Sequence, residues 1–289
     1  MTWRLPFLAA YPFLKKFPAA VARHADALDL FVDSGAFTAW TLKIDITLDE
    51  YCGFLDGLPV RPWNYLTLDV IGDPEGTRRN FDEMRRRGYA PVPIVTRGDG
   101  PGAIEDYYTI SDYVAFGGVA GVTNSSAAWC KAVMGIVGRR KAHLLGMTRM
   151  EWVKALRPYS VDSSSWMQAA RFGTVAVYMG GGVMKQFDPR RGPPPRDVAA
   201  RIRRYGIDPF ALAKGENLKG AWGLGQQVTA LSWVELSMDS EAAIGTRVFL
   251  AAATEQYLDQ LVWAREKVLD LRRPRATIGE AACALSSGQ

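Results

Sequence analysis

The sequence predicts an α/β fold, a (β/α)8 barrel of the TIM type with a helical, basic C-terminal elaboration. From residue 28 onward, short β-rich runs alternate with amphipathic stretches, which is typical of βα units around a parallel sheet. Almost every run ends in glycine or aspartate. The 289 residues, 48% of them hydrophobic, suffice to bury one large core, so we expect a single domain over residues 1–289.

Seven strands are expected, and the eighth strand of a full barrel is not found in the pattern. Residues 3–27 are expected to close one end of the fold. The seven expected strands cover residues 28–32, 65–68, 92–95, 113–116, 142–145, 160–161 and 175–178.

Helices are expected between these strands, at residues 47–58, 74–87, 103–110, 126–137 and 149–156. Thr47 and Glu50 have the spacing of a capping box, and Asp73 precedes a proline at the first helical position, as an N-cap does.

The rhythm of strands and helices breaks at the three glycines of residues 180–182, and a segment rich in proline and arginine follows. We therefore divide the domain into a barrel core at about 28–182, an insertion with C-terminal helices at 183–271 and a tail at 272–289. The expected helices of the second part cover 196–205, 228–236 and 251–271.

Composition limits the chemistry available to the chain. No apolar run is long enough to cross a membrane and no secretory leader is visible, so we expect a cytoplasmic protein, in the host cytoplasm if a phage encodes it. Three scattered cysteines and two histidines fit neither a disulfide framework nor a metal cluster. Acid and base work is therefore expected of carboxylates, without metal or cofactor.

The formal net charge is +5, and arginines gather in five clusters. Each cluster alone is explained equally well by a solvated helix end. Together with nine tryptophans, the clusters favour a polyanionic partner such as DNA or RNA.

Two aspartates at strand ends, Asp33 and Asp162, are the candidate catalytic pair, because the carboxyl ends of parallel strands meet at one rim. The alternative is that each caps a helix or a turn. Phe37 offers a flat ring for a planar ligand, and Gly117 and Gly118 would let backbone N–H groups approach it.

Four segments carry a resemblance to a known family: DSGAF at 33–37, FGGVAG at 116–121, HLLG at 143–146 and VDS at 161–163. In order and approximate spacing they are similar to the motifs of the guanine transglycosylases that act on tRNA. The chain especially resembles the short, phage-type relatives that place 7-deazaguanines into DNA. The resemblance spans roughly residues 28–162.

The resemblance implies a base exchange in which guanine in DNA is replaced by a 7-deazaguanine of the preQ0 type. Asp162 would be the nucleophile that attacks C1′, and Asp33 the general acid and base. Asp69 would read the guanine-like edge, and Val119 would contact the substituent at the 7-position. The other residues implied for the base pocket are Ser34, Phe37, Thr96, Gly117, Gly118, Leu145 and Gly146. Those expected on the nucleic acid are Arg97, Arg190, Arg191 and Arg201.

The chain also departs from the family. The tRNA enzymes carry a zinc site after the nucleophile, whereas residues 180–289 contain no cysteine and histidine set for one. We therefore expect no zinc subdomain, and DNA is favoured over tRNA. Thr96 and Arg97 stand where those enzymes have a glutamine, which leaves the base specificity open.

Other readings remain. They are a tRNA-guanine transglycosylase, a noncatalytic nucleic-acid-binding barrel, and a sugar hydrolase that uses Asp33 and Asp162 as a retaining pair. The identity of the inserted 7-deazaguanine and the choice between monomer and homodimer also stay open.

Overall fold

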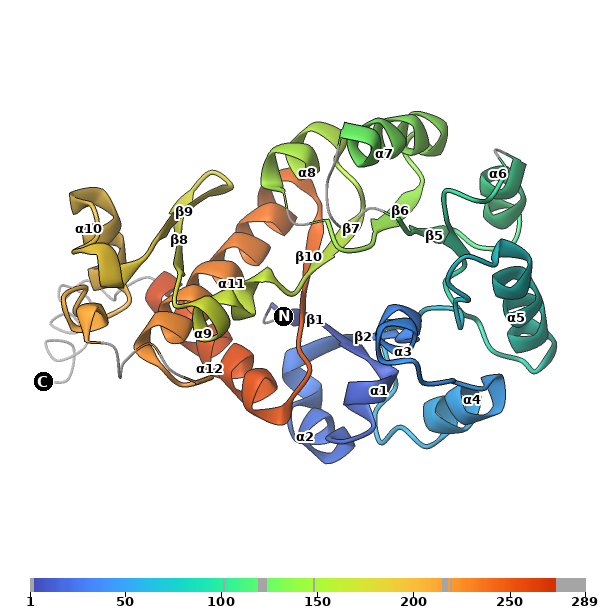
Figure 1. Cartoon of the computed structure of the whole chain (residues 1–289), viewed down its shortest axis with the longest axis horizontal. Coiled ribbons are helices and arrows are strands. Elements are labelled where there is room, and N and C mark those ends of the chain that lie inside the picture. The colour runs from blue at the N-terminus through green and yellow to red at the C-terminus, as the bar shows by residue number, and fades with distance from the viewer. Residues whose placement is uncertain are drawn as a thin grey trace, which may run out of the picture.

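A computed structural model describes residues 3–100, 102–118, 124–147, 149–214, 218 and 220–273. Its main feature is a curled sheet of eight parallel strands (Figure 1). These strands are β1 (Leu5–Ala10), β2 (Leu28–Asp33), β3 (Asn64–Tyr65), β4 (Ile94–Val95), β5 (Tyr113–Phe116), β6 (Lys141–Leu144), β7 (Ser160–Ser163) and β10 (Arg247–Ala251).

The two edges of this sheet meet. The hydrogen-bonded order runs β3-β2-β1-β10-β7-β6-β5-β4, and a parallel bridge between Leu66 and Val92 links the outer strands β3 and β4. Val92 N donates to Tyr65 O at 2.8 Å, and Thr67 N donates to Val92 O at 3.0 Å. The strands therefore follow one another around the ring in chain order, which makes the fold TIM-barrel-like.

Two of the eight strands fall outside the barrel core expected at 28–182. β1 lies in the proline-rich N-terminal segment, and β10 lies next to residues expected to begin a helix. Both strands are buried on both faces, and residues 5–10 and 248–251 are continuous apolar runs, which periodicity cannot distinguish from a buried helix. Together with six of the expected strands, β1 and β10 make up the eight strands of the ring.

The strand expected at 175–178 exists but does not belong to the barrel. It is β8 (Val175–Gly180), which pairs antiparallel with β9 (Val183–Phe187) in a separate hairpin. This hairpin and α10 (Arg196–Arg204) lie to one side of the ring of strands (Figure 1). They belong to a long connection between β7 and β10, so the insertion begins before residue 183.

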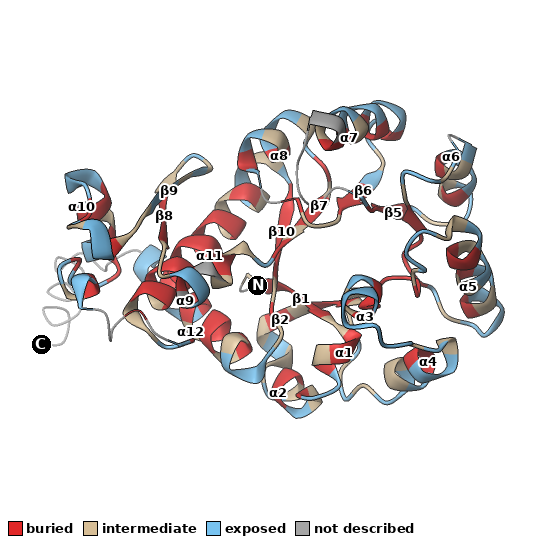
Figure 2. Cartoon of the chain, viewed as in Figure 1, coloured by how far each residue is buried: buried red, intermediate tan, exposed pale blue. Residues whose placement is uncertain are grey.

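Helices cover the outside of the ring, with their buried faces toward the strands (Figure 2). α4 (Leu48–Asp56) begins at the capping box that Thr47 and Glu50 form, and α5 (Pro74–Arg86) begins at the N-cap Asp73, both as expected. The remaining helices are α1 (Tyr11–Leu14), α2 (Pro18–Arg23), α3 (Ala36–Leu42), α6 (Gly102–Tyr108), α7 (Asn124–Val137), α8 (Met150–Leu156), α9 (Gln168–Phe172), α11 (Leu224–Ile244) and α12 (Glu255–Arg272). Among the described residues no helix combines the length and apolarity that a membrane crossing requires.

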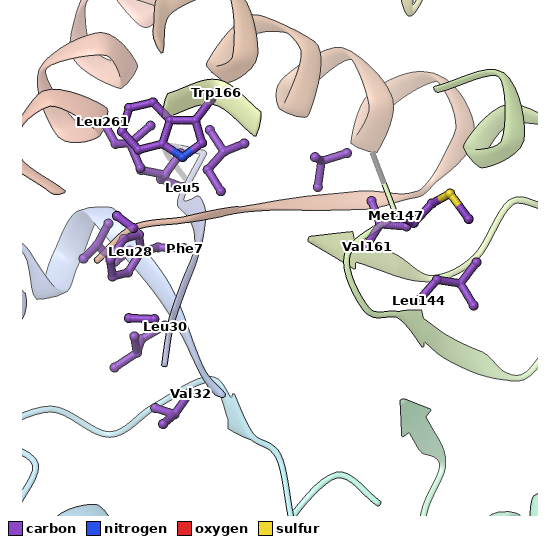
Figure 3. Packing of buried hydrophobic residues seen from close by; sticks show 14 of the residues in the cluster. Leu5, Phe7, Leu28, Leu30, Val32, Leu144, Met147, Val161, Trp166 and Leu261 are labelled. Atoms are coloured by element: carbon purple, nitrogen blue, oxygen red, sulfur yellow. The ribbon is translucent and has the colours of Figure 1, made fainter. Parts of the chain in front are cut away.

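Alternation along the strands divides the core into two layers. On β2, Leu28, Leu30 and Val32 face the helices and project from one side of the strand (Figure 3). Phe31, between them, belongs to the inner cluster of the barrel. Asp33 follows Phe31 by two residues and so points inward at the carboxyl end of the strand.

The inside of the barrel is filled, mainly by aromatic rings. Phe31 lies 5.3 Å from Phe249 and 5.0 Å from His143 between ring centroids. The members of this inner cluster are Leu8, Phe31, Leu66, Val92, Ile94, Tyr113, Ala115 and Phe249. The barrel therefore has a packed floor, above which a ligand must bind at the rim.

Candidate active site

A cavity of about 240 Å³ lies at the carboxyl ends of the strands. This volume is below the roughly 300–1,000 Å³ of pockets that hold drug-sized ligands, so it suits a small one. Residues on or just after six neighbouring strands, β2 to β7, line it. The lining residues are Asp33, Ser34, Ala36, Phe37, Leu66, Asp69, Ile71, Ile94, Gly117, Gly118, Leu145, Gly146 and Asp162.

Asp33 is held by the turn that follows β2. Its Oδ1 accepts a hydrogen bond from Gly35 N at 2.7 Å, which is the turn-capping role that a strand-end aspartate can play. The pKa of Asp33 is raised to about 6, mainly by burial; the Gly35 N–H opposes the rise, and the negative charges of Asp162 and Asp69 add to it. Near neutral pH this carboxyl group is therefore suited to give and take a proton.

Asp69 enters the same cavity from the segment after β3. Its Oδ1 accepts a hydrogen bond from Thr77 Oγ1 at 2.9 Å, and its backbone N donates to Ser34 Oγ at 3.5 Å. Burial raises the pKa of Asp69, and the Thr77 hydroxyl opposes the rise. Thr77, on α5, is thus a supporting residue that sequence reasoning missed, while Ser34 ties the segments after β2 and β3 together.

Asp162 lies on β7, and its side chain is 14% exposed. Its Oδ1 accepts hydrogen bonds from Gly146 N at 2.7 Å and from His143 Nε2 at 3.2 Å. Its Oδ2 accepts none from the described residues. One oxygen is therefore fixed by two donors and the other is left toward the cavity, as a nucleophilic carboxylate requires.

His143, fully buried on β6, is the main site residue that sequence reasoning missed. Its Nδ1 lies 2.7 Å from Ser160 Oγ, which lies 2.5 Å from the Tyr113 hydroxyl. Burial raises the pKa of Tyr113, so its hydroxyl keeps the proton and can donate. These contacts form a series of hydrogen bonds. The Tyr113 hydroxyl donates to Ser160 Oγ, the Ser160 hydroxyl donates to His143 Nδ1, and His143, with its proton on Nε2, donates to Asp162. The inward register of His143, beside Ser160 on β7, could have predicted the contact.

The part of the cavity between Phe37 and Leu145, where a planar ligand is expected, is exposed to solvent on the Phe37 side. Phe37, on α3, lines the cavity yet is 67% exposed, while Leu145 lines it from the segment after β6. Gly118 has a φ of +70°, and a side chain there would press on Arg97 at about 3.3 Å. The two glycines thus keep one side of the cavity free of side chains. Gly117 N donates to Val95 O at 2.8 Å, so this N–H is paired with a neighbouring strand and does not offer itself to a planar ligand as expected.

Of three further residues expected in the base pocket or on the nucleic acid, the structure describes Thr96 and Arg97. Thr96 does not line the cavity, because its backbone N and its hydroxyl both bond Asp99 Oδ2, at 2.7 and 3.0 Å. Arg97 donates to Ser126 Oγ at 2.7 Å. Val119 lies outside the described residues, as do Thr148 and the tail from residue 274.

The arginines expected on the nucleic acid fall into two groups. Arg190 and Arg191 are exposed and share Asp188, at 2.7 and 3.6 Å. Arg201 is only 13% exposed and pairs with Glu235 at 2.7 Å, while its Nε donates to Tyr178 O. This corrects the expectation for Arg201, whose guanidinium fastens α10 to α11 and β8 and is not available to a phosphate.

Within the described part of the chain, no three histidine, cysteine or carboxylate side chains gather as a metal site would require. Cys52 and Cys130 are buried as free thiols.

Neither a scan against protein-family models nor a search of curated proteins finds a match to this chain. Its function is therefore argued from the cavity itself.

Proposed function

We propose that the protein exchanges guanine in DNA for a 7-deazaguanine base through a covalent glycosyl intermediate on Asp162. The observation that carries the proposal is the meeting of three carboxylates, Asp33, Asp69 and Asp162, in one small cavity with a ring and two glycines along its walls. Their hydrogen bonds differ, so each can take a separate task.

In the first displacement, Asp162 Oδ2 attacks C1′ of the target nucleotide. The bond from C1′ to N9 of guanine breaks, its electrons go to the base, and protonated Asp33 gives its proton to the departing guanine. The hydrogen bonds from Gly146 N and His143 Nε2 hold Asp162 in one orientation for this attack. The raised pKa of Asp33 leaves a useful fraction of the acid near neutral pH.

The second displacement reverses these roles. N9 of the incoming base gives its proton to the Asp33 carboxylate and attacks C1′, while Asp162 leaves as a carboxylate. Two inversions give overall retention at C1′, and Asp33 ends protonated, as it began.

We propose that Asp69, Phe37 and Leu145 recognise the base. A carboxylate accepts hydrogen bonds from N1–H and the exocyclic amine of guanine, a pair of donors on one edge of the base. Phe37 and Leu145 would cover the two faces of the ring. A base within a duplex does not reach such a cavity, so the nucleotide is flipped out or already unpaired, and flipping costs a few kcal/mol.

The proposal is tested by measuring the exchange of labelled guanine into a guanine-containing oligodeoxynucleotide. Asp162→Asn and Asp33→Asn are expected to reduce exchange at least about 100-fold, in line with the loss of nucleophilic or acid-base catalysis. Asp112→Asn is the matched control, since Asp112 forms an exposed pair with Lys141 before β5, at the opposite end of the barrel. Exchange by Asp162→Asn at the wild-type rate would remove the nucleophile from the mechanism.

Further measurements distinguish the alternative functions. Incorporation of a labelled 7-deazaguanine into tRNA but not into DNA would identify a tRNA enzyme. Binding of DNA that is unchanged in Asp33→Asn and Asp162→Asn, without any exchange, would identify a noncatalytic barrel. Hydrolysis of a glycan with no action on nucleic acid would identify a sugar hydrolase.

A further inference from the structure

An exposed apolar surface adjoins the cavity, and apart from Phe37 its residues take no part in the chemistry described above. It consists of the α3 residues Phe37, Trp40 and Leu42, which are 67%, 64% and 60% exposed, together with Ile44 just beyond the helix. We call these four residues the α3 patch. Phe37 and Trp40 are in ring contact, and large apolar side chains that are exposed together mark a binding surface more often than single exposed ones do.

The patch continues the wall of the cavity outward. Phe37 lines the cavity, and its ring centroid lies 6.1 Å from that of Trp40, with the planes tilted by 38°. Trp40 therefore stands next to the ring proposed to cover the target base, on the side that leads away from the cavity. Figure 1 shows α3 beside β2, inside the arc formed by α4 and α5.

The position of α3 is built into the fold. Gly35, before the helix, has a φ of +80°, and a side chain there would overlap the ring of Pro12. Ala36 and Ala39 are the buried residues of α3, so the helix packs through small side chains and turns its large ones outward. The exposure of the patch is therefore a consequence of how α3 docks.

We propose that the α3 patch is a stacking platform for the unpaired base next to the target nucleotide in single-stranded DNA. This inference rests on the proposed function. A nucleotide whose base fills the cavity is joined to its neighbour through one phosphate, so the neighbouring base must lie near the cavity mouth. Aromatic side chains beside such a mouth stack on any base, because every base has a flat face.

A cation that can contact the phosphate backbone of a bound strand stands at the C-terminal end of the same helix. Lys43 is exposed, has a φ of +54°, and forms no ion pair with any described residue. A salt-dependent contribution to binding is expected from it.

The test measures the affinity of a fluorescent single-stranded oligodeoxynucleotide by anisotropy. Trp40→Ala is expected to weaken binding about 5- to 150-fold, the range for the loss of one stacked base, whereas Trp40→Phe keeps most of the affinity. Phe210→Ala is the matched control, because Phe210 is another exposed aromatic residue, outside the barrel and away from the cavity. A duplex of the same sequence is expected to bind more weakly than the single strand.

An abasic site next to the target guanine makes the test specific for position. In the wild type, the abasic site should weaken binding by about the same factor as Trp40→Ala does. Combining the abasic site with Trp40→Ala should lower the affinity little more than either change alone. Equal binding by wild type and Trp40→Ala, additive losses, or no measurable binding of single-stranded DNA by the wild type would each overturn the platform. A dimer that becomes a monomer in Trp40→Ala, with DNA binding unchanged, would assign the patch to a second copy of the chain.

Binding and exchange report on separate claims. Loss of affinity in Trp40→Ala together with a wild type that exchanges no base would support the platform and refute the proposed reaction. Normal exchange and normal affinity in Trp40→Ala would refute the platform and leave the reaction standing.

Discussion

At the scale of single residues, the carboxylates of the cavity differ because their surroundings differ. Asp33 is buried near two other acidic groups and receives one backbone hydrogen bond, whereas Asp162 receives two hydrogen bonds on a single oxygen. Strand-end position alone does not distinguish these roles, and the alternative of a turn cap turns out to be true of Asp33 as well. A residue can close a turn with one oxygen and present the other to a ligand.

The raised pKa of Asp33 predicts a cost in stability above that pKa. The group binds its proton more tightly when folded, so its favourable contribution is complete below the unfolded value near 3.8 and is lost as the pH rises through about 6. Asp33→Asn mimics the protonated form, so at pH 8 its free energy of unfolding should exceed that of the wild type by about 2–3 kcal/mol.

Denaturant unfolding between pH 4 and pH 8 measures this difference. The gap between Asp33→Asn and the wild type should close as the pH falls toward 4, and Asp112→Asn should show no such dependence. A constant gap across the range would mean that the surroundings of Asp33 do not raise its pKa.

The hydrogen bond from His143 to Asp162 predicts a positioning effect. His143→Phe removes a donor to a charged group and should lower the exchange rate at saturating substrate about 10- to 100-fold, with little change in KM. His143→Gln can place an amide N–H near Asp162 and should restore part of the rate. If both variants stayed folded and lost activity equally, the hydrogen bond donated to Asp162 would not be the reason for the effect of His143 on the rate.

At the scale of elements, the turn between β2 and α3 sets the outer wall of the cavity. Gly35→Ala combines a strained φ with overlap on Pro12, and we expect it to lower the free energy of unfolding by at least about 2 kcal/mol. Gly88→Ala is the matched control, since Gly88 has a φ of +91° and open space around it. Thermal unfolding of the two variants should therefore separate the effect of the strained φ from that of the overlap with Pro12. Equal losses of stability in the two variants would show that Pro12 moves aside at little cost.

Except for α3, which was not expected, sequence patterns predicted the elements between β2 and β7 well, because amphipathic helices with caps at Thr47 and Asp73 separate the strands. The two strands that close the barrel, β1 and β10, escaped because neither shows the alternation of a half-buried strand. The cavity lining was predictable where a residue lies at or just after the end of its own strand, as Asp33, Asp69 and Asp162 do. The contacts of His143, Thr77 and Arg201 depend on strand register and helix packing, which the sequence does not display.

At the scale of the whole molecule, the two ends of the described chain close the barrel together. β1 pairs with β10 through Phe7 and Leu250, and the N-terminal Trp3 bonds Glu241 and Arg265. The cavity therefore depends on residues far from it in sequence.

Phe249 on β10 tests this dependence. Its ring is fully buried among the aromatic residues that form the cavity floor, so Phe249→Ala should lower the free energy of unfolding by about 3–5 kcal/mol. Phe172→Ala, at an exposed ring, should change it little. A small loss in Phe249→Ala, measured by denaturant unfolding, would contradict the closed, packed barrel.

The central claim is that Asp162 becomes covalently bound to C1′ of the target nucleotide. Its most direct test is mass spectrometry of the intact protein, quenched in acid after mixing with a guanine-containing single-stranded oligodeoxynucleotide, followed by sequencing of the modified peptide. The account predicts a protein–DNA adduct that has lost one guanine, attached at Asp162 and absent in Asp162→Asn. An adduct on another residue, or guanine exchange with no adduct at any time point, would contradict it.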